Sequence, residues 1–208
     1  MASQYERELR AVLAGVPKGV DAVTRSCNSL ERTRAQMVLD RPFLVVRAAG
    51  SGMEGSGDLL ALRGDLCFPI EVKSSKSPKL YLSGRTETQY NAMVHEGKRC
   101  SLMPLYAYRL KGVRGDSRRI FRVEVGKIPG RLGMLCRRIP PLPLTRNGKP
   151  FLDWQAGMPL HMFLSLVCRT SSTEGLTSLE ERTRKVEIDA TRDEELLQTR
   201  LTDMAKSI

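Results

Sequence analysis

Two acidic residues and one lysine lie in neighbouring segments of the chain, with a spacing that could bring them together. Asp58 opens one apolar segment, and Glu71 and Lys73 lie two residues apart in the next, 66–73. Alternate residues of a strand project from the same face, so Glu71 and Lys73 share a face if that segment is extended. A turn near Gly64 would fold Asp58 back beside Glu71. Convergent carboxylates suit Mg²⁺ or Mn²⁺, and a lysine beside them can orient a water, which is the chemistry of metal-assisted phosphodiester hydrolysis.

The same residues also have a structural interpretation. A Glu-x-Lys triplet is common in proteins, and the strand could lie at a solvent-facing edge of a sheet. Two charges on one face of an apolar strand are, however, costly to bury unless that face lines a site. The pattern alone leaves both interpretations open.

The segments around this hairpin alternate between helical and extended patterns. A loop with four glycines, 49–57, precedes the hairpin 58–73. Helices are expected at 4–14, 29–40, 85–96 and 159–168, and further strands at 43–48, 105–110, 120–125 and 151–154. The chain should break at 15–19, which contains a proline, and the continuous apolar run at 43–48 indicates a strand buried on both faces. We therefore expect an α/β fold with a mixed, mostly antiparallel central sheet flanked by helices.

Basic residues outnumber acidic ones, and the excess lies in one part of the chain. The sequence has 34 Lys and Arg against 23 Asp and Glu, a net charge of +11. From residue 171 onward there are 6 basic and 9 acidic residues, so residues 1–170 hold 28 basic and 14 acidic residues, a net charge of +14. Such a surface favours a polyanion, with nucleic acid ahead of an anionic membrane. Aromatic residues make up only 5% of the chain, which favours contact with a duplex backbone over stacking on single strands.

Basic residues between the expected strands 105–110 and 120–125, and others near the hairpin, are the predicted phosphate contacts. The set is Arg47, Lys76, Lys79, Arg85, Arg114, Arg118 and Arg119. The segment between the two strands could equally be a solvated turn whose arginines keep the chain soluble. Phosphate contacts position a protein on DNA without reading its bases, so we expect selectivity for structure rather than for sequence.

Cysteine and histidine usage excludes several classes of site. The five cysteines, at 27, 67, 100, 136 and 168, include no CxxC pair, and the two histidines are His95 and His161. The spacing excludes a zinc ribbon or a thioredoxin-like motif and leaves little material for a histidine metal site or a Ser/His hydrolase. No apolar run approaches the roughly 20 residues of a membrane span, and the first residues lack the apolar stretch of a secretory signal. We expect a cytoplasmic protein, associated with the nucleoid when bound to DNA, without a membrane partner or a small-molecule cofactor.

The acidic hairpin contributes two of six ordered blocks, which lie at 5–9, 45–52, 57–62, 70–75, 79–82 and 147–167. In this order the blocks resemble the archaeal Holliday junction resolvases, within the PD-(D/E)xK nuclease superfamily. The resemblance implies a restriction-endonuclease-like nuclease core and a metal-dependent endonuclease that nicks two opposed strands of a four-way DNA junction in recombination and repair. It also implies a homodimer, whose symmetry matches the two-fold symmetry of a junction.

The resemblance implies roles for individual residues. Asp58 and Glu71 look like the metal-binding carboxylates, with the backbone carbonyl of Val72 as a further ligand. The expected ion is Mg²⁺, which Mn²⁺ could replace. Lys73 looks like the catalytic lysine, and Ser51 corresponds to a serine near the scissile phosphate.

Two further residues match the family with open questions. Gln89 matches a glutamine found beside this motif, and we place it among the DNA contacts. Glu6 matches the family's first-helix glutamate, expected to act in catalysis and metal binding. An insertion at about 16–41 brings a rival, because Glu31 lies 12 residues before Phe43, which is the family's spacing. We favour Glu6, since the helix around it has the better apolar face.

The chain departs from the family in two features, the insertion at about 16–41 and the residue at position 57. Gly57 stands directly before Asp58, where the family usually has proline. Residues 1–170 are expected to form the nuclease domain, and 171–208 a polar tail with a marginal helical pattern that could pack on the body or fray.

Two other functions remain open. The same site would serve a related nuclease that acts on flaps, ends or duplex DNA. The chain could also be a non-catalytic DNA-binding recombination factor on a retired nuclease fold, although such a fold has no physical reason to keep Asp58, Glu71 and Lys73.

Overall fold

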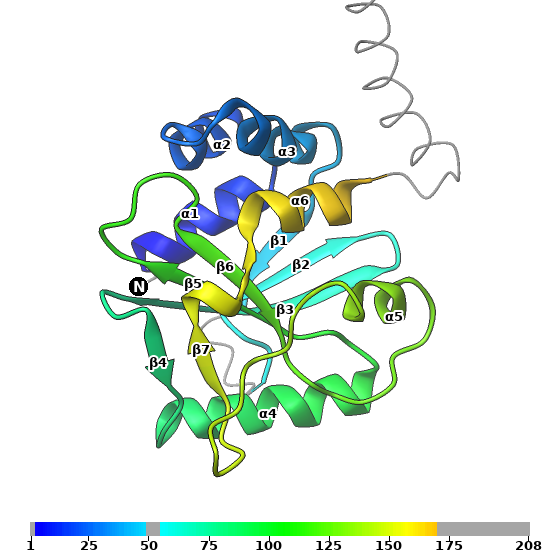
Figure 1. The fold of residues 1–208 in the computed structure, drawn as a ribbon. Coiled ribbons are helices and arrows are strands. Elements are labelled where there is room, and N and C mark those ends of the chain that lie inside the picture. Colours follow the sequence, from blue (N-terminus) through cyan, green and yellow to red (C-terminus); the bar gives the residue numbers. More distant parts are fainter. Residues whose placement is uncertain (1–2, 49–54, 170–208) are drawn as a thin grey trace, which may run out of the picture. The chain divides into compact units, whose positions relative to one another are not determined.

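The acidic hairpin forms part of a six-stranded sheet (Figure 1). The computed structural model describes residues 3–48 and 55–169, and the strands follow the order β1-β2-β3-β5-β6-β8. Their bounds are β1 (Leu44–Arg47), β2 (Leu59–Arg63), β3 (Leu66–Ser75), β5 (Leu105–Leu110), β6 (Arg118–Arg122) and β8 (Met158–Pro159). Strands β3 and β5 run parallel, and the other neighbours run antiparallel. The expected α/β fold with a mixed, mostly antiparallel sheet is confirmed.

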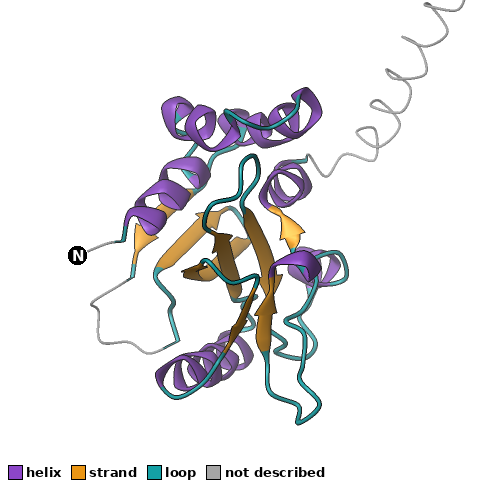
Figure 2. Cartoon of the chain, turned by 60° about the vertical axis from the view of Figure 1, so that its left-hand side comes forward, coloured by secondary structure: helices purple, strands orange, loops and turns teal. Residues whose placement is uncertain are grey.

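Helices cover both faces of this sheet (Figure 2). On one side lie α1 (Gln4–Leu13), α2 (Pro17–Thr24), α3 (Ser29–Asp40) and α6 (Leu160–Cys168), and on the other lies α4 (Arg85–Cys100). The first side is filled by a core in which the Phe68 ring lies 5.9 Å from the rings of both Phe43 and Phe163. Met93 and Tyr108 belong to a second core cluster, which packs α4 on the opposite face. The central strands are therefore buried on both sides.

A crossover links the parallel strands β3 and β5 and carries α4. It begins with β4 (Lys79–Tyr81), which pairs with β7 (Phe151–Asp153) in a separate two-stranded sheet. The Tyr81 and Phe151 rings stack across this pair at 5.3 Å. A short 3-10 helix, η1 (Trp154–Ala156), joins β7 to β8. The small sheet thus joins β4, at the start of the crossover, to β7, which directly precedes η1, β8 and α6.

The helix α2 was not expected, because the sequence around Pro17 suggested a break. Pro17 occupies the first helical position, where its fixed φ suits the helix and its missing N–H costs no helical hydrogen bond. The break is confined to residues 14–16, within which Gly15 has a φ of +65°. The expected insertion at 16–41 therefore consists largely of α2 and α3, and α3 packs along α6.

The expectation that the first strand is buried on both faces is wrong. In β1, Val45 is buried, whereas the side chains of Leu44 and Val46 are 69% and 45% exposed. The physical reason is position: β1 is the edge strand, with one strand neighbour, β2. An apolar run alone does not distinguish a central strand from an edge strand.

Other boundaries differ by a few residues. Strand β6 begins at Arg118, so the expected basic loop 111–119 is shorter than predicted. The helix α5 (Gly130–Cys136) was not expected, and it buries Leu132 and Leu135. The expected tail 171–208 lies outside the described residues. Among the described helices, none is long and apolar enough to cross a membrane.

Candidate active site

Backbone hydrogen bonds hold Asp58 between the end of β1 and the middle of β3. Its N–H donates to the Ile70 carbonyl at 2.8 Å, and its carbonyl accepts from the Ala48 N–H at 3.0 Å. Its carboxylate Oδ2 accepts from the Val72 N–H at 2.8 Å. Asp58 thus lies where β2 begins, directly beside the part of β3 that carries Glu71.

Glu71 and Lys73 project from the same face of β3, as their spacing predicted. The Lys73 Nζ lies 2.7 Å from Glu71 Oε1 and donates a second hydrogen bond to Gln89 Oε1 at 3.0 Å. Glu71 is only 4% exposed, and Gln89 reaches the site from α4. The ammonium is therefore held between a carboxylate and an amide oxygen, facing the same region as Asp58.

The carboxylates at this site repel one another. Burial first, and then the charge of Glu71, raises the pKa of Asp58 to about 6, with a smaller contribution from Glu6. The hydrogen bond from the Val72 N–H and the charge of Lys73 act in the opposite direction. Excess negative charge in a partly buried site is what a divalent cation would neutralise.

Glu6 lies close to this pair, at the start of α1. It forms a capping box with Ser3: Glu6 Oε1 accepts from the Ser3 N–H at 3.1 Å, and Ser3 Oγ accepts from the Glu6 N–H at 3.2 Å. The other oxygen, Oε2, is buried without a hydrogen-bond partner among the described residues and lies 3.9 Å from Arg47 Nε. Glu6 Oε2 therefore lies at ion-pair distance from Arg47, and the charge of Glu6 reaches Asp58.

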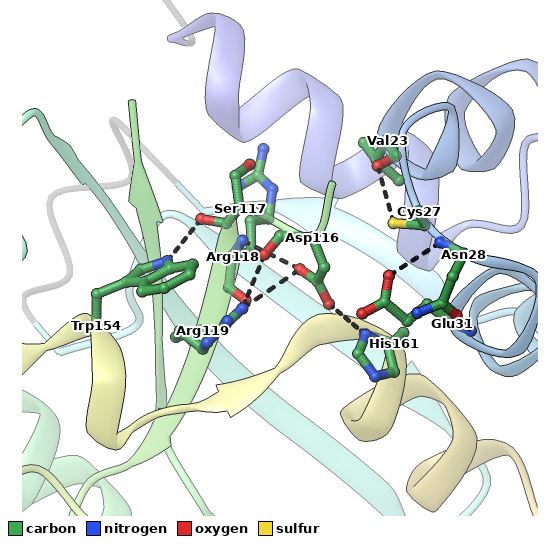
Figure 3. A network of polar contacts seen from close by, with 10 residues as sticks. All are labelled: Val23, Cys27, Asn28, Glu31, Asp116, Ser117, Arg118, Arg119, Trp154 and His161. Carbon is green, nitrogen blue, oxygen red and sulfur yellow. Dashed lines mark hydrogen bonds and ion pairs between the residues drawn. The ribbon is translucent and has the colours of Figure 1, made fainter. Parts of the chain in front are cut away.

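The rival glutamate, Glu31, has different surroundings. It forms an equivalent capping box with Asn28 at the start of α3 and lies near Cys27 and Asp116, as Figure 3 shows. Its charge does not contribute to the pKa shift of Asp58. The geometry favours Glu6 as the glutamate of the candidate site.

Sequence reasoning missed Tyr106, which belongs to the same site. Tyr106 on β5 pairs in register with Glu71 and is fully buried. Its hydroxyl has no hydrogen-bond partner among the described residues, and burial, followed by the charge of Glu71, raises its pKa. The available signal was the parallel pairing of β3 with β5, which a sequence does not reveal by itself. The unpaired hydroxyl is a neutral donor beside the carboxylates.

Gly57 explains why this chain lacks the expected proline. Its φ is +71°, and a Cβ there would lie 2.6 Å from the Ile70 carbonyl oxygen. Proline is fixed near −65° and carries a Cβ, so it fits neither condition. Glycine lets Asp58 reach β3 by a route that proline would block.

Two predicted site groups remain, the Ser51 side chain and the Val72 carbonyl. Ser51 lies outside the described residues. The Val72 N–H is committed to Asp58, and in an extended strand the carbonyl of a residue points to the same edge as its N–H. The Val72 carbonyl is therefore directed toward Asp58.

The prediction that Arg118 contacts DNA is wrong. Its side chain is 2% exposed and lies 3.1 Å from Glu8 Oε2, and its Nη2 donates to the Tyr5 carbonyl at 2.9 Å. Arg119 is also largely covered, because its guanidinium stacks 3.7 Å from the Trp154 ring centre and pairs with Asp116. A guanidinium that is buried and already paired presents little surface to a phosphate.

The other predicted DNA contacts are more accessible. Lys76, Arg85 and Arg114 are exposed, and Lys79 is 52% exposed although it lies 3.6 Å from Asp153. Arg47 is 38% exposed beside Glu6. Of the predicted DNA contacts, Arg118 and Arg119 are therefore covered, whereas the basic residues near β3 and Arg114 remain accessible.

The donor set fits a divalent cation that keeps part of its water shell. Within residues 3–48 and 55–169, no group of three or more His, Cys, Asp and Glu side chains is placed to hold a metal ion. Asp58 and Glu71 supply hard oxygens, and Mg²⁺ is usually held by one or two carboxylates together with water and substrate phosphates. These residues therefore suit Mg²⁺ better than a metal that needs an all-protein site.

Comparison with known proteins identifies one family. Residues 22–124 match the family model described as archaeal Holliday junction resolvase (hjc). This range contains Asp58, Glu71, Lys73 and Glu31, and it begins after Glu6. The structure of Archaeoglobus fulgidus Hjc, a Holliday junction resolvase from an archaeal hyperthermophile, is similar with 20% identity and a TM-score of 0.41, covering 65% of this chain and 92% of that chain. No curated protein matches the sequence.

Replacing Gly57 tests the route into the site. Gly57→Pro should lower the free energy of unfolding by about 2 kcal/mol or more, because proline cannot adopt the positive φ and would contact Ile70. Urea denaturation measures this loss. Gly64→Ala is the control, since Gly64 also has a positive φ, +55°, but nothing lies within 4 Å of an added Cβ. Equal losses in the two variants would contradict the close approach at Gly57.

The raised pKa of Asp58 predicts a pH-dependent stability. Because the pKa of Asp58 is about 6 in the folded protein and ordinarily 3.8, the protonated side chain stabilises the fold below pH 4, and this stability is lost as the pH rises through 6. Without divalent cations, Asp58→Asn should therefore melt progressively higher than the wild type between pH 4 and 7. Melting curves in EDTA across this range test it, and parallel curves would contradict the shift.

Proposed function

The chain belongs to the archaeal Holliday junction resolvase family, and from this premise we propose how its residues cleave a four-way DNA junction. It is a nuclease whose substrate is junction DNA. The observation that carries the proposal is the convergence of Asp58 and Glu71 beside Lys73, which is fixed by Gln89. These groups are the ones that hydrolysis of a phosphodiester requires.

We propose that Asp58 and Glu71 hold Mg²⁺, with the Val72 carbonyl and Glu6 as further oxygen ligands. Mn²⁺ should substitute, because it accepts the same hard oxygens. When bound, the cation supplies positive charge to an attacking water and to the scissile phosphate. The repulsion at Asp58, to which Glu71 and Glu6 both contribute, supports this assignment.

Lys73 positions the nucleophile in this proposal. Its ammonium has three N–H groups, of which two point to Glu71 and Gln89, so a third remains to hold a water or a phosphate oxygen. Tyr106 keeps its proton at neutral pH and can donate a hydrogen bond to charge that develops beside Glu71. Ser51 is proposed as a contact to the scissile phosphate.

The exposed basic residues near β3 would grip the DNA arms. Lys76, Lys79 and Arg85 lie between the active strand and the start of α4, and Arg47 lies at the end of β1. Phosphate contacts of this kind recognise the path of the backbone and carry no base sequence. A homodimer would place two such sites on a two-fold symmetric junction, in the cytoplasm where the DNA lies.

Removing the carboxylates should abolish cleavage and spare binding. Asp58→Asn and Glu71→Gln should each lower the rate of Mg²⁺-dependent junction cleavage at least about a hundredfold, because each loses a metal ligand. Junction affinity, measured by gel shift in Ca²⁺ or EDTA, should be unchanged or tighter. Asp65→Asn is the matched control, since Asp65 lies in the β2–β3 turn and is 61% exposed. Cleavage at the wild-type rate by either site variant would end the assignment.

The two candidate first-helix glutamates can be compared directly. Glu6 and Glu31 each close a capping box at the third helical position, so replacement by glutamine leaves both caps largely intact. Glu6→Gln should slow cleavage at least about tenfold, whereas Glu31→Gln should cleave like the wild type. If Glu31→Gln is the inactive variant, the family match that begins at residue 22 marks the catalytic helix, and Glu6 is only a cap.

A further inference from the structure

A second polar site lies apart from the carboxylates that hold the metal in our proposal. A cavity of about 220 Å³ is enclosed by the α2–α3 connection, the β5–β6 turn and the start of α6. Its charged and titratable lining includes Glu8, Arg109, Arg114, Asp116, Arg118 and His161. One wall of the cavity is formed by residues of α2, α3 and the connection between them.

The two carboxylates of the lining are already fully engaged. Glu8 pairs with both Arg109 and Arg118. Asp116 accepts from the His161 N–H at 2.9 Å, its Oδ2 lies 2.8 Å from His161 Nδ1, and its Oδ1 accepts from the Arg118 N–H at 3.1 Å (Figure 3). Their oxygens thus satisfy neighbouring donors.

Two guanidinium donors of the lining are unsatisfied. Arg118 is 2% exposed, yet its Nη1 has no hydrogen-bond partner among the described residues, and the buried Nε of Arg109 has none either. Burial lowers the pKa of Arg118 to about 10, so the guanidinium stays charged at neutral pH. A buried donor without a partner is costly, and the cost is greater for a charged group.

The charge of the lining also favours an anion. Three arginines face two carboxylates, which leaves an excess positive charge when His161 is neutral. The cavity offers donors and no free acceptors at its arginines, so the complementary ligand is an acceptor with negative charge. Its volume suits a small molecule, and Val113, Leu160 and Leu164 add an apolar side to the wall.

We propose that this cavity binds a small oxyanion, a phosphate or carboxylate group, through the guanidinium groups of Arg109, Arg114 and Arg118 that line it. Charge-assisted hydrogen bonds from two separate guanidinium groups suit the oxygens of a single anion. The site is distinct from the proposed nuclease centre, because none of Glu6, Asp58, Glu71 and Lys73 lines the cavity.

The two histidines of the chain provide a direct test. His161 lines the cavity, whereas the side chain of His95 on α4 is 75% exposed and is absent from its lining. Inorganic phosphate and acetate are titrated separately into the full chain in EDTA, at constant pH and ionic strength, and the imidazole NMR signals are recorded. We expect saturable shifts of the His161 signals by at least one of the two anions, with little change at His95. Parallel behaviour of both histidines, or no saturation against the chloride control, would overturn the proposal.

Three variants locate the binding. Arg118→Met removes the buried donor and should weaken anion binding about tenfold or more. Because this variant could fail to fold, Val113→Phe is used as well; it fills the cavity while every charge remains. Arg99→Met removes an exposed arginine of α4 and should bind like the wild type. Unchanged affinity in Val113→Phe would show that the anion binds elsewhere and would refute the site.

Discussion

The charge of Glu71 on β3 acts on Asp58 at the start of β2, where both side chains are largely buried. Each neighbouring feature compensates for this repulsion. The Val72 N–H binds the Asp58 carboxylate, and Lys73, held by Gln89, balances Glu71. Burying two carboxylates together is costly, and a cation bound between them, as we propose, would relieve that repulsion.

The helix α1 connects this centre with the second polar site. Glu6 is near Asp58, while Glu8, two residues further along, pairs with Arg109 and Arg118. Residues two apart on a helix point in different directions, so one helix serves two environments. The family match begins at residue 22, after α1, yet it is Glu6 whose charge reaches Asp58. Along the chain, α2 and α3 separate α1 from β1, against which α1 packs.

The basic residues of the chain lie in two kinds of surroundings. Some basic residues, such as Lys76 and Arg85, remain on the surface near β3, where they can meet a phosphate backbone. Others are covered inside the fold: Arg118 donates a hydrogen bond to α1, and Arg119 lies over the Trp154 ring. Net charge predicts that a polyanion is favoured, but it does not tell which arginines are available to bind it.

The sequence by itself determined the α/β fold and the hairpin that carries Asp58, Glu71 and Lys73. Alternation along one strand places Glu71 and Lys73 on the same face without any distant partner. Tertiary structure decided everything that depends on contacts across elements. Pairing of β3 with β5 brought Tyr106 beside Glu71, packing against other elements buried Arg118 in its ion pair with Glu8, and the edge position of β1 left its apolar residues exposed. Such contacts join residues far apart along the chain, and local patterns of charge and hydrophobicity carry no record of which partners meet.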